Sequence, residues 1–143
     1  SKTAEAFKVS LITGALAGGA DNESLGILEE FSYLIGAAYQ LKDDLEDIAL
    51  PEEGNVLRNP SAVISALAER SGEPGQEILK SLVARNDIDE IHKLIKKYNI
   101  DDFIQSLMEE YLVSIDSCLS GMQNIPLKLA LHEIVGKTFS KYL

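Results

Sequence analysis

The sequence lacks the features that mark a membrane protein or a disulfide-linked secreted domain. Cys118 is the only cysteine among 143 residues, so it cannot form an internal disulfide, and its apolar helical context favours a small core residue over a nucleophile. The longest weakly polar stretch, residues 11–20, is interrupted by Thr13, is rich in glycine and is too short to span a membrane. These absences predict a chain without a transmembrane segment in a reducing, cytoplasmic setting.

Positive charge is also scarce. Thirteen lysines and arginines stand against 23 aspartates and glutamates, which gives a formal net charge of −10. Such a chain repels nucleic acid and anionic lipid unless basic residues gather locally. The short basic run at residues 93–98, KLIKKY, has the mixed helical pattern of a solvated face. The composition therefore predicts no nucleic-acid partner.

Strand-like alternation is equally scarce, whereas apolar residues recur at spacings of three and four almost throughout the chain. With 45% apolar residues the chain can bury a sizeable core, so we predict one all-α helical domain over residues 1–143. Glycine, proline, asparagine and aspartate divide this domain into helices. The predicted helices span about residues 2–16, 22–48, 60–70, 76–84, 87–98, 102–119 and 126–143, with a loop at 51–59.

One stretch, GAAYQLKDDLEDI at residues 36–48, concentrates acidic residues on a predicted helix. On a wheel of about 100° per residue, Asp43, Asp44 and Asp47 lie on one stripe. The opposite side carries an apolar arc suited to a bundle core: Phe31, Leu34, Ala37, Ala38, Leu41, Leu45 and Ile48. Crowded carboxylates repel, so this stripe needs an explanation.

Two interpretations stay open at this point. The stripe is either a solvated face of an acidic protein or a divalent-cation site. Carboxylates without His or Cys suit Mg²⁺, which keeps several waters and shares its coordination shell with substrate phosphates. Gly36 removes side-chain bulk on the stripe, although close helix packing explains it as well, and Gln40 offers an amide to a polar ligand atom. Lys42 can pair with Glu46 at the i, i+4 spacing, which leaves the three aspartates uncompensated.

The segment Tyr39 to Asp47, YQLKDDLED, resembles the second aspartate-rich motif of the trans-isoprenyl diphosphate synthases, in which an aromatic-Gln pair precedes Asp-Asp-x-x-Asp on a long helix. Lys2-Thr3-Ala4 resembles the Lys-Thr motif of that family, and an apolar helix and the small residues at 14–19 follow it. The tail at 111–143 is also similar to the family's C-terminal end. The resemblance implies the C-terminal half of an all-α, isoprenoid-synthase-type helical bundle, a fragment of a larger synthase.

The resemblance also implies a function. A prenyltransferase of this family condenses an allylic diphosphate with isopentenyl diphosphate to a linear isoprenoid diphosphate, and it depends on Mg²⁺. By this resemblance three aspartates would bind the metal, with the first as the principal direct ligand: Asp43, Asp44 and Asp47. Three other side chains would contact the substrate diphosphate or the departing pyrophosphate: Lys2, Thr3 and Gln40. Without the downstream motif, an exposed terminal lysine is the simpler interpretation of Lys2.

Two departures from the family pattern predict that this chain alone is inactive, even where its parent is a polyprenyl- or geranylgeranyl-type diphosphate synthase. The family's first aspartate-rich motif would lie on a helix that precedes Lys2, so this sequence does not contain it. The loop at 51–59 has Asn55 where a lysine is expected. Half a bundle leaves apolar surface uncovered, which predicts a missing N-terminal half or a homodimer partner. The alternative is a non-catalytic helical subunit or homologue that acts as an interaction module. A class I terpene cyclase fragment fits less well, because those usually carry an Asn/Ser/Glu triad.

Overall fold

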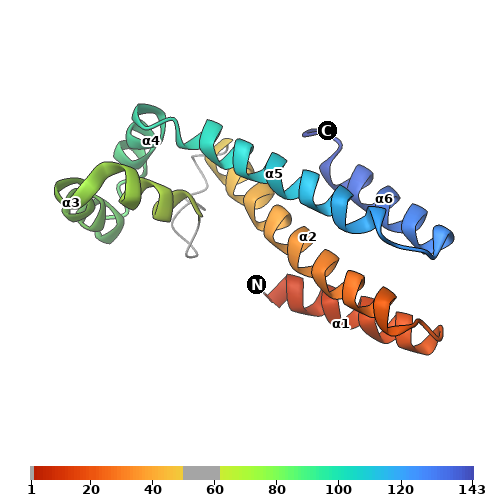
Figure 1. Cartoon of the computed structure of the whole chain (residues 1–143). Helices are drawn as coiled ribbons and strands as arrows, with labels where there is room; N and C mark the ends of the chain where they lie inside the picture. The colour runs from red at the N-terminus through yellow and green to blue at the C-terminus, as the bar shows by residue number, and fades with distance from the viewer. Residues whose placement is uncertain (1, 50–61) are drawn as a thin grey trace. The chain divides into compact units, whose positions relative to one another are not determined.

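The computed structural model describes the backbone of residues 2–49 and 62–143, and the side chains of 6–49 and 62–143. Within these ranges the chain forms helices and no strand, which confirms the predicted all-α class (Figure 1). The helices are α1 (Lys2–Ala17), α2 (Asn22–Ala49), α3 (Ala62–Ala84), α4 (Ile88–Lys97), α5 (Ile100–Ser120) and α6 (Ile125–Phe139). The predicted loop at 51–59 and the predicted helix start at Pro60 lie outside the described residues.

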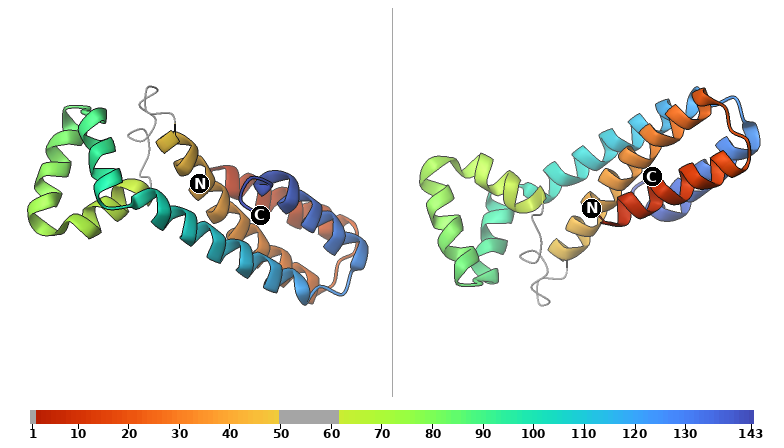
Figure 2. Two further views of the ribbon diagram at one scale, coloured as in Figure 1. Left: turned by 90° about the horizontal axis from the view of Figure 1, so that it is seen from above. Right: turned by 90° about the horizontal axis from the view of Figure 1, so that it is seen from below.

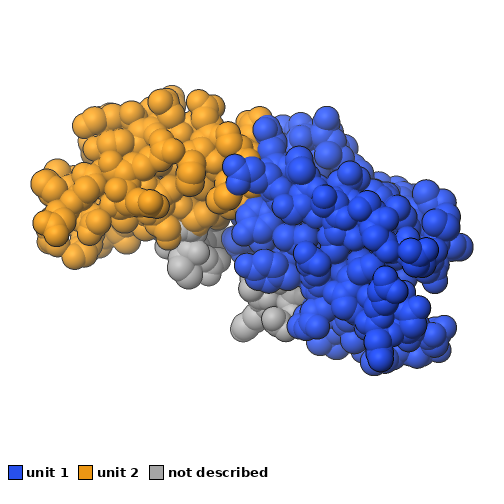
Figure 3. Space-filling model, viewed as in Figure 1, with its two compact units in different colours: residues 1–40, 108–143 blue, residues 41–107 orange. Residues whose placement is uncertain are grey.

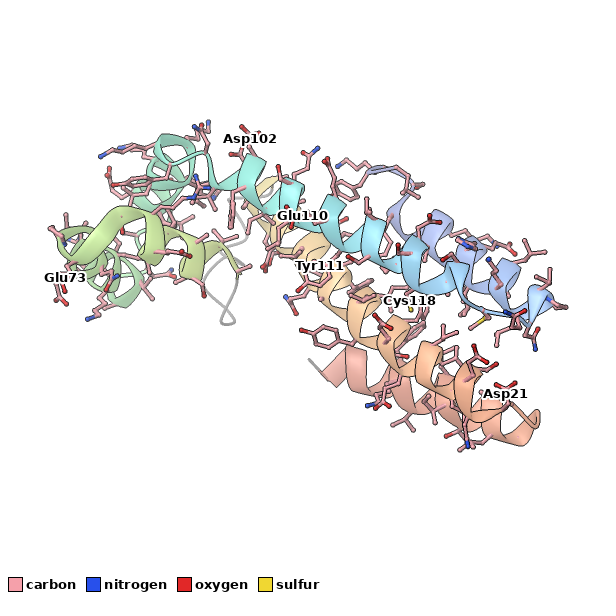
Figure 4. All side chains as sticks on the ribbon, in the orientation of Figure 1. Asp21, Glu73, Asp102, Glu110, Tyr111 and Cys118 are labelled. Atoms are coloured by element: carbon pink, nitrogen blue, oxygen red, sulfur yellow. The ribbon has the colours of Figure 1, made fainter. Side chains whose placement is uncertain are left out.

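Side-chain caps begin α2 and α6 close to the predicted starts at residues 22 and 126. Asp21, labelled in Figure 4, accepts a hydrogen bond from the Ser24 backbone N at 2.7 Å, and this bond lowers the pKa of Asp21. Asn124 caps α6 by accepting from the Leu127 backbone N at 3.0 Å. The last helix ends at Phe139 rather than at Leu143, because its final backbone groups close into a tighter turn, with Tyr142 N donating to Phe139 O at 2.8 Å.

The break predicted at residues 71–75, SGEPG, is a bend inside α3. Gly72 has φ 68° and ψ −179°, a backbone conformation that residues with a Cβ rarely adopt. Across the bend, the Gln76 side-chain amide donates to the Ala68 carbonyl at 3.1 Å. The two helices predicted on either side of SGEPG therefore form the two arms of one bent element.

Gly75 lies against Ser71 in this bend. A Cβ at Gly75 would stand 2.3 Å from Ser71 Cβ and 2.6 Å from Ser71 Oγ, closer than two such atoms can approach. We therefore expect Gly75→Ala to lower the free energy of unfolding by about 1–3 kcal/mol, measured by urea denaturation. Gly26→Ala in α2 is the matched control, because a Cβ there meets nothing within 4 Å. Gly26→Ala should raise the free energy of unfolding by about 0.5–1 kcal/mol. If Gly75→Ala also stabilised the protein, Gly75 would not lie as close to Ser71 as described.

The chain divides into two compact units, residues 1–40 with 108–143 and residues 41–107 (Figure 3). Helices α2 and α5 each contribute residues to both units. The single domain predicted for residues 1–143 stays a prediction.

The first unit contains α1, most of α2, most of α5 and α6, with α1 beside α2 and α6 beside α5 (Figure 2). The rings of Phe7 and Phe31 join α1 to α2 with centroids 6.3 Å apart. Cys118 joins α5 to α2 through a 3.5 Å hydrogen bond to the Ile27 carbonyl, and partial burial raises the pKa of its thiol. Buried apolar side chains from α2, α5 and α6 form the core: Leu28, Phe31, Ile35, Ala38, Met108, Leu112, Ile115, Leu119, Leu131, Val135 and Phe139.

The second unit contains the last part of α2, all of α3 and α4, and the first part of α5. Arg70 connects α3 to the end of α4 and to α5. Its guanidinium lies 4.6 Å from the centroid of the Phe103 ring and donates a hydrogen bond to the Tyr98 carbonyl at 3.3 Å. The apolar core of the unit comes from all four elements: Leu41, Val63, Ala66, Leu67, Leu79, Leu82, Ile91, Ile95, Ile100 and Ile104. Within residues 2–49 and 62–143, no helix has both the length and the apolar content needed to cross a membrane.

Candidate functional site

The acidic stretch at 36–48 lies within α2, which is continuous from Asn22 to Ala49. Gly36, Gln40, Asp43 and Asp47 follow one another at intervals of three or four residues, so they share one face of the helix. All four are partly exposed. The structure therefore presents two carboxylates and one amide on a common, solvent-accessible face of α2.

The surroundings of Asp43 on this face disfavour the charged form of its carboxylate. Partial burial raises its pKa, the Lys42 ammonium opposes this effect, and the negative charges of Glu46 and Asp47 add to it. Lys42 is engaged with Glu46 at 2.9 Å, which is the ion pair that the sequence predicts. Ionised Asp43 therefore costs the fold free energy, and a bound cation would offset that cost.

Asp44 lies apart from this face. It is 3% exposed, and its Oδ2 accepts a hydrogen bond at 2.8 Å from the backbone N of Ala62, the first residue of α3. Helical spacing alone places Asp44 on the acidic stripe, and the buried positions of α2 explain why the structure differs. Ile35, Ala38, Leu41 and Asp44 are buried at successive intervals of three, so the buried face turns by about 60° at each step and reaches Asp44.

The donor set fits a hydrated divalent cation rather than an ion enclosed by protein. Within the part of the chain that the structure describes, no three His, Cys, Asp or Glu side chains gather into a group that could hold a metal. Mg²⁺ keeps several waters and needs only one or two carboxylates together with substrate phosphates. Asp43 and Asp47 can supply those two carboxylates, because they share the exposed face of α2.

The two predicted residues at the start of the chain cannot be placed in the site. Lys2 and Thr3 open α1, but their side chains lie outside the described ones. Their contact with a diphosphate stays a prediction. By contrast, the proximity of Gln40 to Asp43 follows from α2 itself, since the two residues are three apart on one helix.

A cavity of about 580 Å³ lies elsewhere in the first unit, between the end of α1, the start of α2 and the turn that precedes α6. Its lining includes Gly14, Gly18, Ser24 and Asn124. Neither Asp43 nor Asp47 is among the residues that line this cavity. The small residues at 14–19 therefore line a cavity that is separate from the acidic face.

Comparisons with known proteins converge on one kind of enzyme. The chain is 36% identical over 77 residues to farnesyl diphosphate synthase from Geobacillus stearothermophilus, covering 50% of this chain and 26% of that protein. It is 29% identical over 120 residues to heptaprenyl diphosphate synthase component 2 from Bacillus subtilis (strain 168), covering 78% of this chain and 34% of the relative. It is 26% identical over 123 residues to a short chain isoprenyl diphosphate synthase from Methanothermobacter thermautotrophicus, covering 78% and 38%.

The chain thus spans between 26% and 38% of the length of these three relatives. No family model matches it, and no solved structure matches it.

Proposed function

Because this chain belongs to the trans-isoprenyl diphosphate synthase family, we propose that it is the C-terminal part of a polyprenyl- or geranylgeranyl-type diphosphate synthase. The proposed reaction condenses an allylic diphosphate with isopentenyl diphosphate to a linear isoprenoid diphosphate, in the cytoplasm. The observation that carries the proposal is the exposed face of α2, where Asp43 and Asp47 stand beside Gln40.

Each side chain of this face has a distinct proposed role. Asp43 and Asp47 would hold Mg²⁺, which stabilises the negative charge that develops on the leaving pyrophosphate. Gln40 would donate its amide hydrogens to the diphosphate. Lys2 would add a positive charge and Thr3 a hydroxyl, if their side chains reach the same diphosphate.

The proposal includes a partner for this chain, because the first unit exposes large apolar side chains on all four of its helices. They include Val9 and Leu16 of α1, Tyr33 of α2, Val113 of α5 and Leu129 of α6, each more than half exposed. Exposed apolar side chains mark interaction sites where they lie together on one surface. We propose the missing N-terminal half of the synthase or a second copy of the chain as the partner. One relative is itself named component 2 of its enzyme, which supports a second polypeptide.

Calorimetric titration with inorganic pyrophosphate tests the proposed site in the chain by itself. We expect binding that requires Mg²⁺ and disappears when EDTA is added. We also expect no prenyl transfer from an allylic diphosphate to isopentenyl diphosphate, because the first aspartate-rich motif is not part of this sequence. Pyrophosphate binding that is equal with and without Mg²⁺ would contradict the proposal.

A second candidate function follows from the same exposed side chains. A non-catalytic subunit would self-associate or bind a synthase partner and show no Mg²⁺-dependent affinity for pyrophosphate. The titration distinguishes the two candidates, because only the synthase fragment should bind pyrophosphate in a Mg²⁺-dependent manner, while sedimentation of the chain shows whether it self-associates. The coding sequence upstream of Ser1 gives a further test, since an aspartate-rich helix there would support the enzyme.

A further inference from the structure

We infer that Asp44 is a positioning residue that fastens the motif helix α2 to the first turn of α3, and that it is not a third metal ligand. The inference rests on the proposed function, and it assigns different roles to the three aspartates of the motif. Asp43 and Asp47 would bind the metal, while the carboxylate between them would set the direction in which they point.

Asp44 accepts a hydrogen bond from the first turn of α3. The first backbone N–H groups of a helix have no partner within the helix, and Ala62 opens α3. Asp44 Oδ2 accepts from the Ala62 N–H at 2.8 Å, so the carboxylate satisfies one of these groups. A negative charge at this end also interacts favourably with the helix dipole. The contact joins residues 18 positions apart and connects two helices of the second unit.

Asp44 also has little contact with solvent. Asp44 is 3% exposed and belongs to the second unit, whose core includes Leu41, Val63 and Leu67. Hydrated Mg²⁺ needs room for several water molecules, and a carboxylate with so little access to solvent does not provide it. Burying a carboxylate is costly unless it is hydrogen-bonded, and the Ala62 amide supplies such a bond.

The place of Asp44 on α2 links this contact to the site. Asp43 precedes it directly, Asp47 follows within one turn, and α2 ends at Ala49. Helix ends fray when nothing holds them. An anchor at Asp44 fixes the rotation of this last part of α2 about its axis, and that rotation sets where Asp43 and Asp47 point. Binding groups must be held to within about 0.5 Å to act together.

The test compares three variants of the chain: Asp44→Asn, Asp44→Ala and Asp43→Asn. Asparagine keeps an acceptor oxygen and caps a helix about as well as aspartate, whereas alanine cannot. We expect Asp44→Asn to keep the Mg²⁺-dependent affinity for pyrophosphate within about threefold of the wild type. Asp44→Ala should lose about 10- to 100-fold, as removal of a supporting residue does in metal sites.

Amide hydrogen exchange provides a readout that does not depend on the metal. Asp44→Ala should speed exchange of the Ala62 amide, Asp44→Asn should restore its protection, and Asp43→Asn should leave it unchanged. If Asp44→Asn loses as much affinity as Asp43→Asn, Asp44 is a ligand and the inference is wrong. It is also wrong if Asp44→Ala leaves exchange at Ala62 unchanged. If no variant alters pyrophosphate binding while Asp44→Ala still loses protection, the positioning role stands and the proposed function fails.

Discussion

Asp43→Asn is expected to lower the Mg²⁺-dependent affinity of the chain for pyrophosphate by about 100-fold or more. The substitution removes the proposed principal ligand, and removing even a supporting residue of a metal site costs about 10- to 100-fold. A neutral amide is also a poor substitute for a carboxylate on a hard cation. Calorimetry with Mg²⁺ and pyrophosphate measures the loss.

The same substitution is expected to stabilise the protein without ligand. Burial raises the pKa of Asp43, and Glu46 and Asp47 raise it further against the effect of Lys42. The folded state therefore holds this proton more tightly than the unfolded state, and the ionised carboxylate weakens the fold above the folded-state pKa. The increase in the free energy of unfolding caused by Asp43→Asn should therefore be largest at a pH above the folded-state pKa of Asp43. It should vanish as the pH falls below the unfolded value of about 3.9. Urea denaturation across this pH range measures the difference.

Glu46→Gln is the matched control for the affinity measurement. Glu46 is exposed on the same helix and pairs with Lys42 at 2.9 Å, so the substitution removes a nearby charge without touching the proposed ligands. We expect affinity close to the wild-type value and a loss of at most about 1 kcal/mol in stability. Equal losses of affinity in the two variants would show that general negative charge on α2, rather than Asp43, attracts the metal.

Phe31→Ala is expected to cost about 3–5 kcal/mol in the free energy of unfolding. Phe31 is 0% exposed in the apolar core of the first unit, and its ring centroid lies 6.3 Å from that of Phe7. Small domains are stable by only about 5–15 kcal/mol, so this loss removes a large fraction of the total. Thermal and urea denaturation should both show it.

Tyr33→Ala tests whether that cost comes from burial rather than from loss of an aromatic ring on α2. Tyr33 lies two residues further along the helix and is 68% exposed. Its hydroxyl interacts with Tyr111, whose pKa is raised chiefly by burial. We expect its removal to change stability by about 0.5 kcal/mol, as for most surface substitutions. Similar losses in both variants would mean that Phe31 does not occupy the core position described above.

The starts of α2 and α6 and the bend in α3 were predictable because their signals are local, whereas α6 ends at Phe139, before the predicted end at Leu143. Gly72 needs a positive φ, Asp21 and Asn124 reach backbone N–H groups three residues ahead, and these requirements act wherever the rest of the chain lies. The shared face of Gln40, Asp43 and Asp47 was predictable for the same reason, since their spacing decides it once the helix forms.

By itself, the sequence determined an all-α chain, the long helix α2 and the common face of Asp43 and Asp47, because helical spacing and capping act over a few residues. Only the tertiary structure decided that Asp44 is buried. A helical wheel orders side chains around an axis, but it does not show which part of the circumference another helix covers. The burial of Asp44 depends on contacts with residues distant in sequence. The backbone N–H of Ala62, 18 residues further along, donates to the Asp44 carboxylate, so Asp44 is buried while Asp43 and Asp47 stay partly exposed.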